Sequence, residues 1–254
     1  MKLAASDYDG TLFRRGQVSR EDLAAIAAWR SRGHLFGLAT GRDLNLIRDE
    51  ISERQIPYDF LICDTGAGLY GPDLTPIHLA ALPPQAAPLV MDHPATAGSL
   101  YRLFSRYGKT YLDLRSSRSW LTGLGLPLIP IEPEEARKMT GLQQIGLEFS
   151  SPAEAQACAE ALNRDFNGLY AQQSSFCVDI IAAGCSKGAG LKLLLELKGW
   201  RPEAVLTVGD SENDLSMFDF WPQGAYVMAD ATDQVRARAH KVVESPAAML
   251  WDNL

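Results

Sequence analysis

A regular alternation of short apolar segments with amphipathic helical segments, interrupted once, limits the fold of this chain more than any other feature. Three apolar runs, Leu3–Ser6, Leu35–Ala39 and Phe60–Cys63, are separated by segments with helical periodicity that begin near Ser19 and Asp43. Strand-sized runs that alternate with helices are typical of βαβ units around a parallel sheet. The sequence therefore predicts an α/β fold.

The alternation stops at Leu82, where a proline-rich stretch begins, and it resumes after Gly184. The resumed pattern predicts a helix carrying Leu191, a strand at Val205–Val208, a further helix and two short strands, Ala225–Met228 and Lys241–Val243. The intervening pattern, from about Ser99 onwards, predicts a mixture of helices and strands: a helix, a strand, an irregular segment containing Pro127, Pro130 and Pro133, a strand at Ile145–Phe149, a helix at Ala153–Phe166 and two strands near Tyr170 and Val178.

The simplest organisation is one domain interrupted by another. We expect residues 1–81 and 183–254 to form a Rossmann-like parallel-sheet core. Residues 82–182 would form an inserted α+β domain, with the proline-rich stretch as the linker into it.

Charge and hydropathy exclude several classes of partner. The formal net charge is -7, so no overall positive field is present to hold nucleic acid. No apolar run approaches the roughly 18 residues of a membrane-spanning helix, and the first residues lack the pattern of a secretory signal. We expect a cytoplasmic protein, without nucleic-acid or membrane partners, that acts as a monomer or homodimer.

Acidic residues gather at the ends of two predicted strands. Asp7-Tyr8-Asp9-Gly10-Thr11 follows the first strand, and Gly209-Asp210-Ser211-Glu212-Asn213-Asp214 follows Val205–Val208. Carboxyl ends of parallel strands are where open α/β sheets bind ligands. Taken alone, the first segment is equally typical of an Asp-Gly turn, and the second of a helix N-terminus capped by Asp210.

Two further segments carry groups suited to an anion. Thr40-Gly41-Arg42 directly follows the second strand and offers a hydroxyl group and backbone N–H groups near a helix N-terminus. Lys187 precedes the helix that begins around Gly188. Each segment alone is an ordinary loop or helix cap. Together, the four segments supply the components of a phosphoryl-transfer site.

These four segments resemble the four motifs of the haloacid dehalogenase-like hydrolases, and the position of the insert resembles that of the Cof-type branch with an α/β cap. The chain departs from the usual pattern of that branch at Thr65, where asparagine is usual, and at Ala229 and Asp230, where glycine and asparagine are usual. An Asp-Gly-Val segment usual near the C-terminus is absent as well. These departures affect expected substrate contacts and leave the acidic motifs intact.

The resemblance implies a Mg²⁺-dependent phosphatase with an aspartyl-phosphate intermediate. Asp7 would be the nucleophile, and Asp9 the general acid and base, for which it needs a raised pKa. The metal ligands would be Asp7, Asp210 and the backbone carbonyl of Asp9, with Asp214 orienting a metal-bound water or Lys187. The expected phosphate contacts are Thr40, Gly41, Lys187 and Asn213. Without a cation, this acidic cluster would repel a phosphate dianion.

The expected substrate is a small phosphorylated metabolite, in particular a sugar-phosphate-like monoester. Arg42, Arg115 and Arg118 are candidate contacts for the leaving group, although the two last arginines are also typical of a solvated basic surface. A phosphomutase of the same superfamily is the main alternative, and release of free phosphate separates the two. A catalytically inactive, metal-binding regulatory module is a further alternative.

Overall fold

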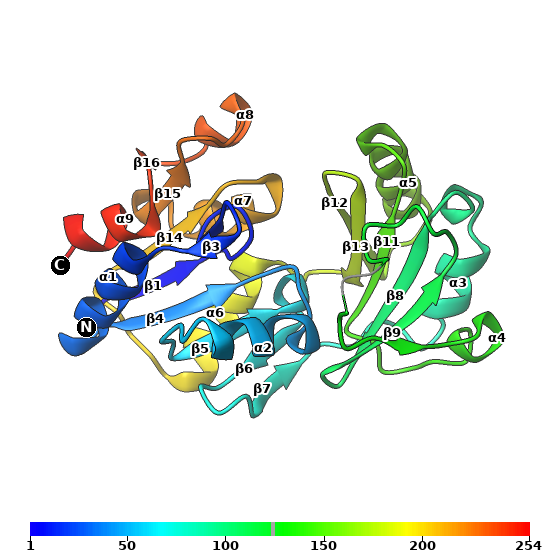
Figure 1. The fold of residues 1–254 in the computed structure, drawn as a ribbon, viewed down its shortest axis with the longest axis horizontal. Coiled ribbons are helices and arrows are strands. Elements are labelled where there is room, and N and C mark those ends of the chain that lie inside the picture. The colour runs from blue at the N-terminus through cyan, green and yellow to red at the C-terminus, as the bar shows by residue number, and fades with distance from the viewer. Residues whose placement is uncertain (123–124) are drawn as a thin grey trace. The chain divides into compact units, whose positions relative to one another are not determined.

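The computed structural model describes residues 1–122 and 125–254. The chain divides into two compact units, whose elements are labelled in Figure 1. The first unit comprises Met1–Thr40, Glu50–His78 and Ser186–Leu254, and the second comprises Gly41–Asp49 and Leu79–Cys185. Residues 41–49, which the sequence pattern places with the core, thus group with the second unit.

The first unit is built on a mainly parallel sheet. Its strand order is β16-β15-β14-β1-β4-β5-β6-β7, with β14 and β4 both parallel to β1, whereas β6 is antiparallel to β5. The predicted strands of this unit are confirmed. The strands of the sheet are β1 (Leu3–Ser6), β4 (Leu35–Ala39), β5 (Phe60–Cys63), β6 (Gly68–Tyr70), β7 (Pro76–Leu79), β14 (Val205–Gly209), β15 (Ala225–Met228) and β16 (Lys241–Val243), and the strands β2 (Phe13–Arg14) and β3 (Gln17–Val18) form a separate hairpin.

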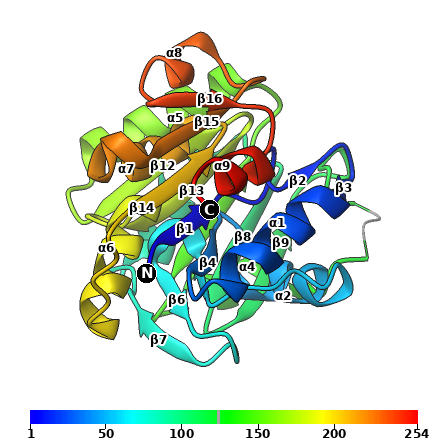
Figure 2. The same ribbon diagram turned by 90° about the vertical axis from the view of Figure 1, so that its left-hand side faces the viewer.

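Helices cover both faces of this sheet. Figure 2 shows α1 and α9 on one side and α6 and α7 on the other. Ser19, Ser186 and Ser245 cap the helices α1, α6 and α9 by accepting backbone N–H groups. The helices of the first unit are α1 (Arg20–Ser31), α6 (Lys187–Lys198), α7 (Leu215–Phe220), α8 (Asp233–Arg236) and α9 (Pro246–Asp252), with 3₁₀ turns η1 (Asp64–Gly66), η3 (Glu212–Asp214) and η4 (Pro222–Gly224). Helix α2 (Leu44–Glu53) begins in the second unit and ends in the first.

Strand β1 directs its end toward helix α6. Leu3 and Ala5 are buried in one apolar cluster with Leu191 and Leu194 of α6. Because side chains of a strand alternate between faces, the next residue on this face is Asp7. The packing of the sheet against α6 therefore places a carboxylate beside the start of that helix.

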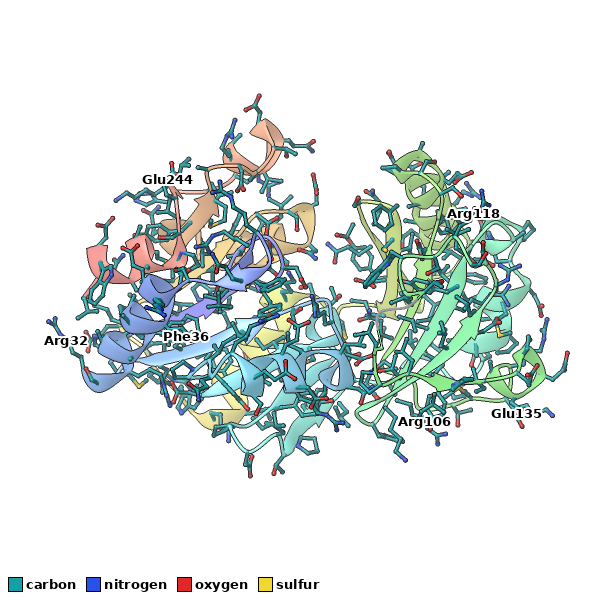
Figure 3. All side chains as sticks on the ribbon, in the orientation of Figure 1. Arg32, Phe36, Arg106, Arg118, Glu135 and Glu244 are labelled. Carbon is teal, nitrogen blue, oxygen red and sulfur yellow. The ribbon has the colours of Figure 1, made fainter. Side chains whose placement is uncertain are left out.

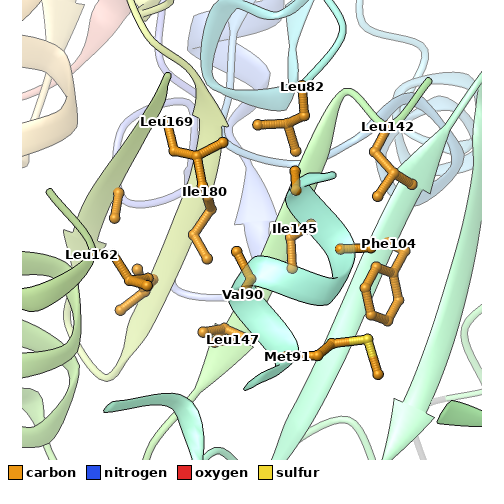
Figure 4. Packing of buried hydrophobic residues seen from close by; sticks show 14 of the residues in the cluster. Leu82, Val90, Met91, Phe104, Leu142, Ile145, Leu147, Leu162, Leu169 and Ile180 are labelled. Atoms are coloured by element: carbon orange, nitrogen blue, oxygen red, sulfur yellow. The ribbon is translucent and has the colours of Figure 1, made fainter. Parts of the chain in front are cut away.

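The second unit contains a mostly antiparallel sheet in the order β10-β9-β8-β11-β13-β12, in which the edge strand β10 pairs parallel to β9. Helices α3 and α5 contribute to an apolar core on one face of this sheet (Figure 4). Its elements are α3 (Ala86–Asp92), η2 (Pro94–Thr96), β8 (Tyr101–Arg106), β9 (Lys109–Leu114), β10 (Ile129–Pro130), α4 (Pro133–Ala136), β11 (Gln144–Glu148), α5 (Pro152–Asp165), β12 (Leu169–Ser174) and β13 (Cys177–Ala182).

Two predictions for this region are wrong. The helix expected from about Ser99 is instead the β8–β9 hairpin, whose turn uses Tyr107 and Gly108 at positive φ. Phe104 packs in the core while the alternate residues face away, so the period is that of a strand. The proline-rich stretch expected to be a linker contains helix α3. Most of its prolines lie before or after the helix. Pro88 lies in the first turn, where the missing N–H group of proline breaks no helical hydrogen bond.

Within the described residues, the helices are too short or too polar to cross a membrane.

Candidate active site

Asp7 and Asp210 lie at the carboxyl ends of adjacent parallel strands. Asp7 follows β1 and Asp210 follows β14, and the Asp7 N–H group donates to the Val208 carbonyl at 2.9 Å. The chain runs from β1 to β4 on one side and later returns to β14 on the other. The two carboxylates therefore lie where the strand order changes direction, as expected for a ligand site in such sheets.

Lys187 is fully buried among acceptors. Its Nζ donates to Asp7 Oδ1 at 2.6 Å, to Asp214 Oδ1 at 2.7 Å and to Asn213 Oδ1 at 2.9 Å. Burial alone would lower the pKa of this ammonium group, but the carboxylates of Asp214 and Asp7 outweigh burial and raise its pKa. Lys187 is therefore a fixed positive charge that joins the two acidic segments.

The carboxylates themselves are costly to keep ionised. Burial raises the pKa of Asp7 well above its usual value; Lys187 opposes this shift, while Asp214 and Asp210 add to it. Burial also raises the pKa of Asp210 to about 6, against a hydrogen bond from Thr11 that lowers it. One lysine thus does not fully compensate the acidic groups, and the site favours additional positive charge.

Thr11 and Gly10 fix the position of Asp210. Thr11 Oγ1 donates to Asp210 Oδ1 at 2.7 Å. A Cβ atom on Gly10 would lie 2.5 Å from Asp210 Oδ2, and Gly10 has a φ of +83°. The turn after Asp9 therefore requires glycine both for its backbone conformation and for the close approach of this carboxylate.

Asp214 holds the second acidic segment together. Its Oδ2 atom accepts the backbone N–H groups of Asp210 at 3.0 Å and Ser211 at 3.1 Å, while its Oδ1 atom accepts Lys187. Ser211 Oγ lies 2.9 Å from Asn213 Oδ1, which also accepts Lys187. Both oxygens of Asp214 are thus engaged in orienting the segment and the lysine.

The acidic residues fit a divalent cation. Carboxylate oxygens of Asp7, Asp210 and Asp214 lie within 4.8 Å of one another. Asp7 Oδ2 is buried and has no hydrogen-bond partner within residues 1–122 and 125–254. Hard oxygen donors with an unsatisfied buried acceptor suit Mg²⁺. Of the predicted ligand residues, Asp7 and Asp210 are in this group, whereas the side chain of Asp9 is exposed.

The predicted phosphate-binding segment is divided between the units. Thr40 is buried at the end of β4, and its N–H group donates to the Ile62 carbonyl at 2.8 Å. Gly41 and Arg42 belong to the second unit, where the Gly41 carbonyl accepts Gln144 Nε2 at 3.2 Å. Thr40 therefore shares a unit with Asp7 and Lys187.

Arg115 and Arg118 also belong to the second unit. Arg115 NH1 donates to the Thr96 carbonyl at 3.2 Å, and to the Ser99 carbonyl at 3.1 Å and hydroxyl oxygen at 2.8 Å. Arg118 is exposed at the surface of that unit (Figure 3). Arg115 thus supports the loop before β8, and its assignment as a leaving-group contact stays a prediction.

Sequence reasoning missed some residues that support the site. Thr11 lies within the first acidic motif, so its place in the sequence indicates a role in the site, although it does not indicate the hydrogen bond to Asp210. Gly66 was not singled out for packing: a Cβ atom there would lie 2.0 Å from the Ser186 carbonyl oxygen, immediately before Lys187. That contact joins η1 to the start of α6 across 120 positions of sequence, which no local pattern indicates.

The site has the residues of a known hydrolase family. A sequence model described as haloacid dehalogenase-like hydrolase matches residues 4–248. The chain belongs to this family. The resemblance inferred from the four motifs is therefore confirmed.

Solved structures of the family share the fold over almost the whole chain. A haloacid dehalogenase-like hydrolase from B. subtilis has a TM-score of 0.86 and 20% identity, and the match covers 100% of both chains. A putative HAD/COF-like hydrolase from Plasmodium vivax has a TM-score of 0.84 and 20% identity, covering 99% of this chain and 94% of the other. A structure described as a HAD subclass IIB sugar phosphatase has a TM-score of 0.80 and 20% identity, with 98% and 95% covered.

Proposed function

We propose that this hydrolase is a Mg²⁺-dependent phosphatase of small phosphorylated metabolites, with Asp7 as its nucleophile. The observation that carries the proposal is the hydrogen bonding of the two carboxylate oxygens of Asp7. One oxygen of its buried carboxylate is bound by Lys187, while the other has no hydrogen-bond partner among the described residues. A carboxylate held in one orientation at a strand end, with an oxygen left available, suits attack on a phosphoryl group.

In the first step, an oxygen of Asp7 forms a bond to phosphorus as the bond from phosphorus to the leaving oxygen breaks. Asp9, whose side chain is exposed two residues further on, gives its proton to the leaving alcohol. Lys187 stays protonated and reduces the negative charge around the transferring group, supported by Asp214 and Asn213. The products are an aspartyl phosphate and a free alcohol.

In the second step, water attacks phosphorus and gives a proton to Asp9. The bond from phosphorus to the Asp7 oxygen breaks, which restores the Asp7 carboxylate and releases inorganic phosphate. Asp9 returns to its protonated state, so acid and base roles alternate within one cycle. Thr40 is proposed to donate to phosphate from the end of β4.

Asp7 and Asp210, with the backbone carbonyl of Asp9, are proposed to hold Mg²⁺. The raised pKa values of Asp7 and Asp210 support a cation here, because both shifts reflect buried carboxylates with too little compensating charge. When bound, Mg²⁺ would offset negative charge on the phosphoryl oxygens. Asp214 is proposed to act from outside the ligand set, since its oxygens are engaged by Lys187 and backbone N–H groups.

The second unit is proposed to select the leaving group. Ile145 and Leu147 of β11 face its apolar core, so Gln144 and Glu148 lie on the opposite face of the sheet. By register, Asp179 lies on that same face, and Gln172 pairs with Asp179. We call these four residues the acceptor face.

The acceptor face offers oxygens rather than positive charge. Gln144 Nε2 donates to Asp179 Oδ1 at 2.8 Å. The side-chain oxygens of Gln144 and Gln172 are buried and lack hydrogen-bond partners within the described parts of the chain. Buried acceptors are normally satisfied by donors. This composition supports a leaving group rich in hydroxyl groups, as in a sugar phosphate, over an anionic one.

A phosphate-release screen tests the proposed function. Purified wild-type protein and the Asp7→Asn variant would be assayed with Mg²⁺ on sugar phosphates, nucleotides, phosphoglycerates and p-nitrophenyl phosphate. We expect inorganic phosphate from wild type with a preference for sugar phosphates, no turnover by Asp7→Asn, and loss of wild-type activity on chelation. Transfer of phosphate to a second position without release of free phosphate would indicate a mutase and contradict the proposal.

A further inference from the structure

A carboxylate outside the proposed catalytic residues is buried in the first unit. Asp22, in the first turn of helix α1, is fully buried. Its Oδ1 atom accepts the Ala247 N–H group at 3.0 Å, and its Oδ2 atom accepts the Ser19 hydroxyl group at 2.7 Å. These bonds join the start of α1 to the start of helix α9 and orient both carboxylate oxygens. Buried charges are normally paired, so a cation is expected beside this carboxylate.

Arg14 of strand β2 is this cation, and it also reaches the turn that carries the proposed catalytic aspartates. Its Nη2 atom donates to Asp22 Oδ2 at 2.7 Å, and its Nη1 atom donates to the Thr11 carbonyl. The backbone beside it is fixed as well, because the Phe13 N–H group donates to the Tyr8 carbonyl at 2.7 Å. Since the guanidinium group is a planar and rigid donor, its two bonds hold the Thr11 carbonyl in place relative to Asp22.

Thr11 connects this ion pair to a proposed ligand of Mg²⁺. It is fully buried, and its hydroxyl group donates to Asp210 Oδ1 at 2.7 Å. A series of hydrogen bonds thus runs from Asp22 through Arg14 and Thr11 to Asp210. All four residues belong to the first unit, so the series lies within one compact body. The orientation of the Asp210 carboxylate therefore depends on an ion pair that does not touch it.

We propose that Arg14 and Asp22 are positioning residues that set the affinity of the site for Mg²⁺, because they act through Thr11 on the orientation of Asp210. The inference rests on the proposed function, in which Asp210 is a metal ligand. Mg²⁺ demands nearly octahedral geometry, so a carboxylate that is held in place binds it more tightly than one that is free to rotate. Replacing residues that orient metal ligands typically weakens metal binding about 10- to 100-fold. An ion pair needed only for folding would leave the Mg²⁺ affinity of the folded protein unchanged.

Titration calorimetry of the substrate-free protein with magnesium chloride measures this affinity without turnover. We expect Arg14→Met to raise the Kd for Mg²⁺ roughly tenfold, because methionine fills similar space and removes both donors. Asp22→Asn should raise the Kd less, roughly threefold, because the asparagine oxygen can still accept a hydrogen bond from Arg14 without the charge. Since Asp22 acts only through Arg14, the double variant should have the Kd of Arg14→Met alone.

Arg15→Met and Asp59→Asn are the matched controls. Arg15 is exposed between strands β2 and β3 of the same hairpin. Asp59 also pairs with an arginine, Arg30, at 2.7 Å and accepts the Phe36 N–H group at 2.9 Å, but it directly precedes β5, at the end of the strand away from the proposed site. Asp59→Asn should lower stability with an unchanged Kd for Mg²⁺, and Arg15→Met should change neither. If Arg14→Met does not fold, the double variant replaces it, because its asparagine leaves no buried charge unpaired.

Phosphate release from p-nitrophenyl phosphate gives a second readout. The Mg²⁺ concentration for half-maximal activity should rise in Arg14→Met by the same factor as the Kd, and excess Mg²⁺ should restore most of the lost activity.

Two results would overturn the role of Arg14 and Asp22. One is a Kd for Mg²⁺ that is the same in the wild type and in Arg14→Met or the double variant. The other is a double variant whose Kd equals the product of the two single effects. A wild type that binds Mg²⁺ but releases no phosphate would refute the proposed function, while the Kd values would still test the two residues. A wild type that binds no Mg²⁺ would refute both.

Discussion

Lys187 is the residue on which the charge balance of the site depends. Its ammonium group bonds the carboxylates of Asp7 and Asp214 in a place where none of the three groups is appreciably exposed. Removing one partner from such a buried group leaves the others uncompensated, which typically costs about 3–5 kcal/mol. The contacts that stabilise the fold therefore also hold the ammonium group in the place that the proposed reaction requires.

Lys187→Met should lower the free energy of unfolding of the metal-free protein by about 3 kcal/mol or more at pH 7. Because Lys187 lowers the pKa of Asp7, its loss should raise that pKa further, and protonation of Asp7 should restore part of the stability as the pH falls. The measurement is urea unfolding between pH 5 and 8. Lys192→Met, an exposed lysine of the same helix, is the control. A deficit that stays constant with pH would contradict this account.

Asp210 should make the metal-free protein less stable as the pH rises. Its pKa in the folded state is about 6, against an ordinary value of 3.8, so the folded state binds more protons than the unfolded state between these values. The free energy of unfolding then falls as the pH increases through this range, by up to about 3 kcal/mol for this group. Asp210→Asn cannot titrate and should show a smaller fall between pH 4 and 7. Parallel pH profiles for the two proteins would refute the assignment.

At the scale of elements, the contact between η1 and the start of α6 sets the position of Lys187. Gly66 has a φ of +99°, and its Cα atom faces the Ser186 carbonyl closely enough that a side chain would collide with it. Ser186 caps α6 by accepting the Ala189 N–H group at 3.1 Å. A displacement of this carbonyl would therefore move the cap and the lysine that follows it.

Gly66→Ala should destabilise the protein more than Gly33→Ala does. Gly33 has a φ of +78°, and a Cβ atom there would have no neighbour within 4 Å among the described residues, so it reports the backbone cost alone. We expect about 1 kcal/mol for Gly33→Ala and about 2 kcal/mol more for Gly66→Ala, with reduced kcat only in the latter. Urea unfolding and steady-state kinetics measure both. Equal losses would show that the close approach to Ser186 is unimportant.

The sequence predicts the six parallel strands of the first unit and its helices α1 and α6, because most of these strands are short apolar runs and serine caps both helices. The short strands β2, β3, β6 and β7 and the helices α8 and α9 are not predicted. The structure confirms two of these local patterns. A helix cap is formed by Ser19 with Asp22, and a strand is formed by Leu35–Ala39 before Thr40. The β8–β9 hairpin is not predicted because its turn places Tyr107 at positive φ, a conformation that is uncommon for an aromatic residue, before Gly108. Helix α2 starts where predicted, but its grouping with the second unit depends on Thr110 and Pro127, which lie far along the chain.

The candidate site likewise contains residues that the sequence predicts and contacts that it does not predict. Asp7, Lys187, Asp210 and Asp214 stand in recognisable segments after strands, and the structure brings them together. The contact of Gly66 with Ser186 and the hydrogen bond of Tyr8 to Glu50 are tertiary and have no local signal. The charge of Arg115 makes it a candidate anion contact, whereas its bonds to the Thr96 and Ser99 carbonyls depend on a loop conformation that the sequence does not specify.

In the whole molecule, we propose that the first unit carries out the chemistry and that the second unit selects the substrate. Gln172→Met tests this division, because it removes a buried acceptor oxygen while keeping a similar length. We expect kcat/KM for the best sugar phosphate to fall about tenfold, a loss of about 1.4 kcal/mol, with p-nitrophenyl phosphate changed less than twofold. Gln173→Met, on the alternate face of β12, is the control. Equal losses on both substrates would contradict selection by the acceptor face.

Alanine at Arg115 and Arg118 tests the competing expectation that arginines contact an anionic leaving group. Since Arg115 bonds the loop carbonyls of Thr96 and Ser99, Arg115→Ala should lower stability without altering the ranking of substrates. Arg118→Ala should change neither. A selective loss on anionic substrates such as phosphoglycerates would instead favour the arginines.

In the proposed mechanism, phosphate passes through a covalent bond to Asp7, and this aspartyl phosphate can be trapped. The wild-type enzyme would be mixed with its best substrate and Mg²⁺, quenched in acid within the first turnover, reduced with borohydride and examined by peptide mass spectrometry. Borohydride reduces an aspartyl phosphate to homoserine. We predict homoserine at position 7 only, absent from Asp7→Asn and from reactions without substrate. Homoserine at position 9, or rapid turnover with no modified aspartate, would contradict the mechanism.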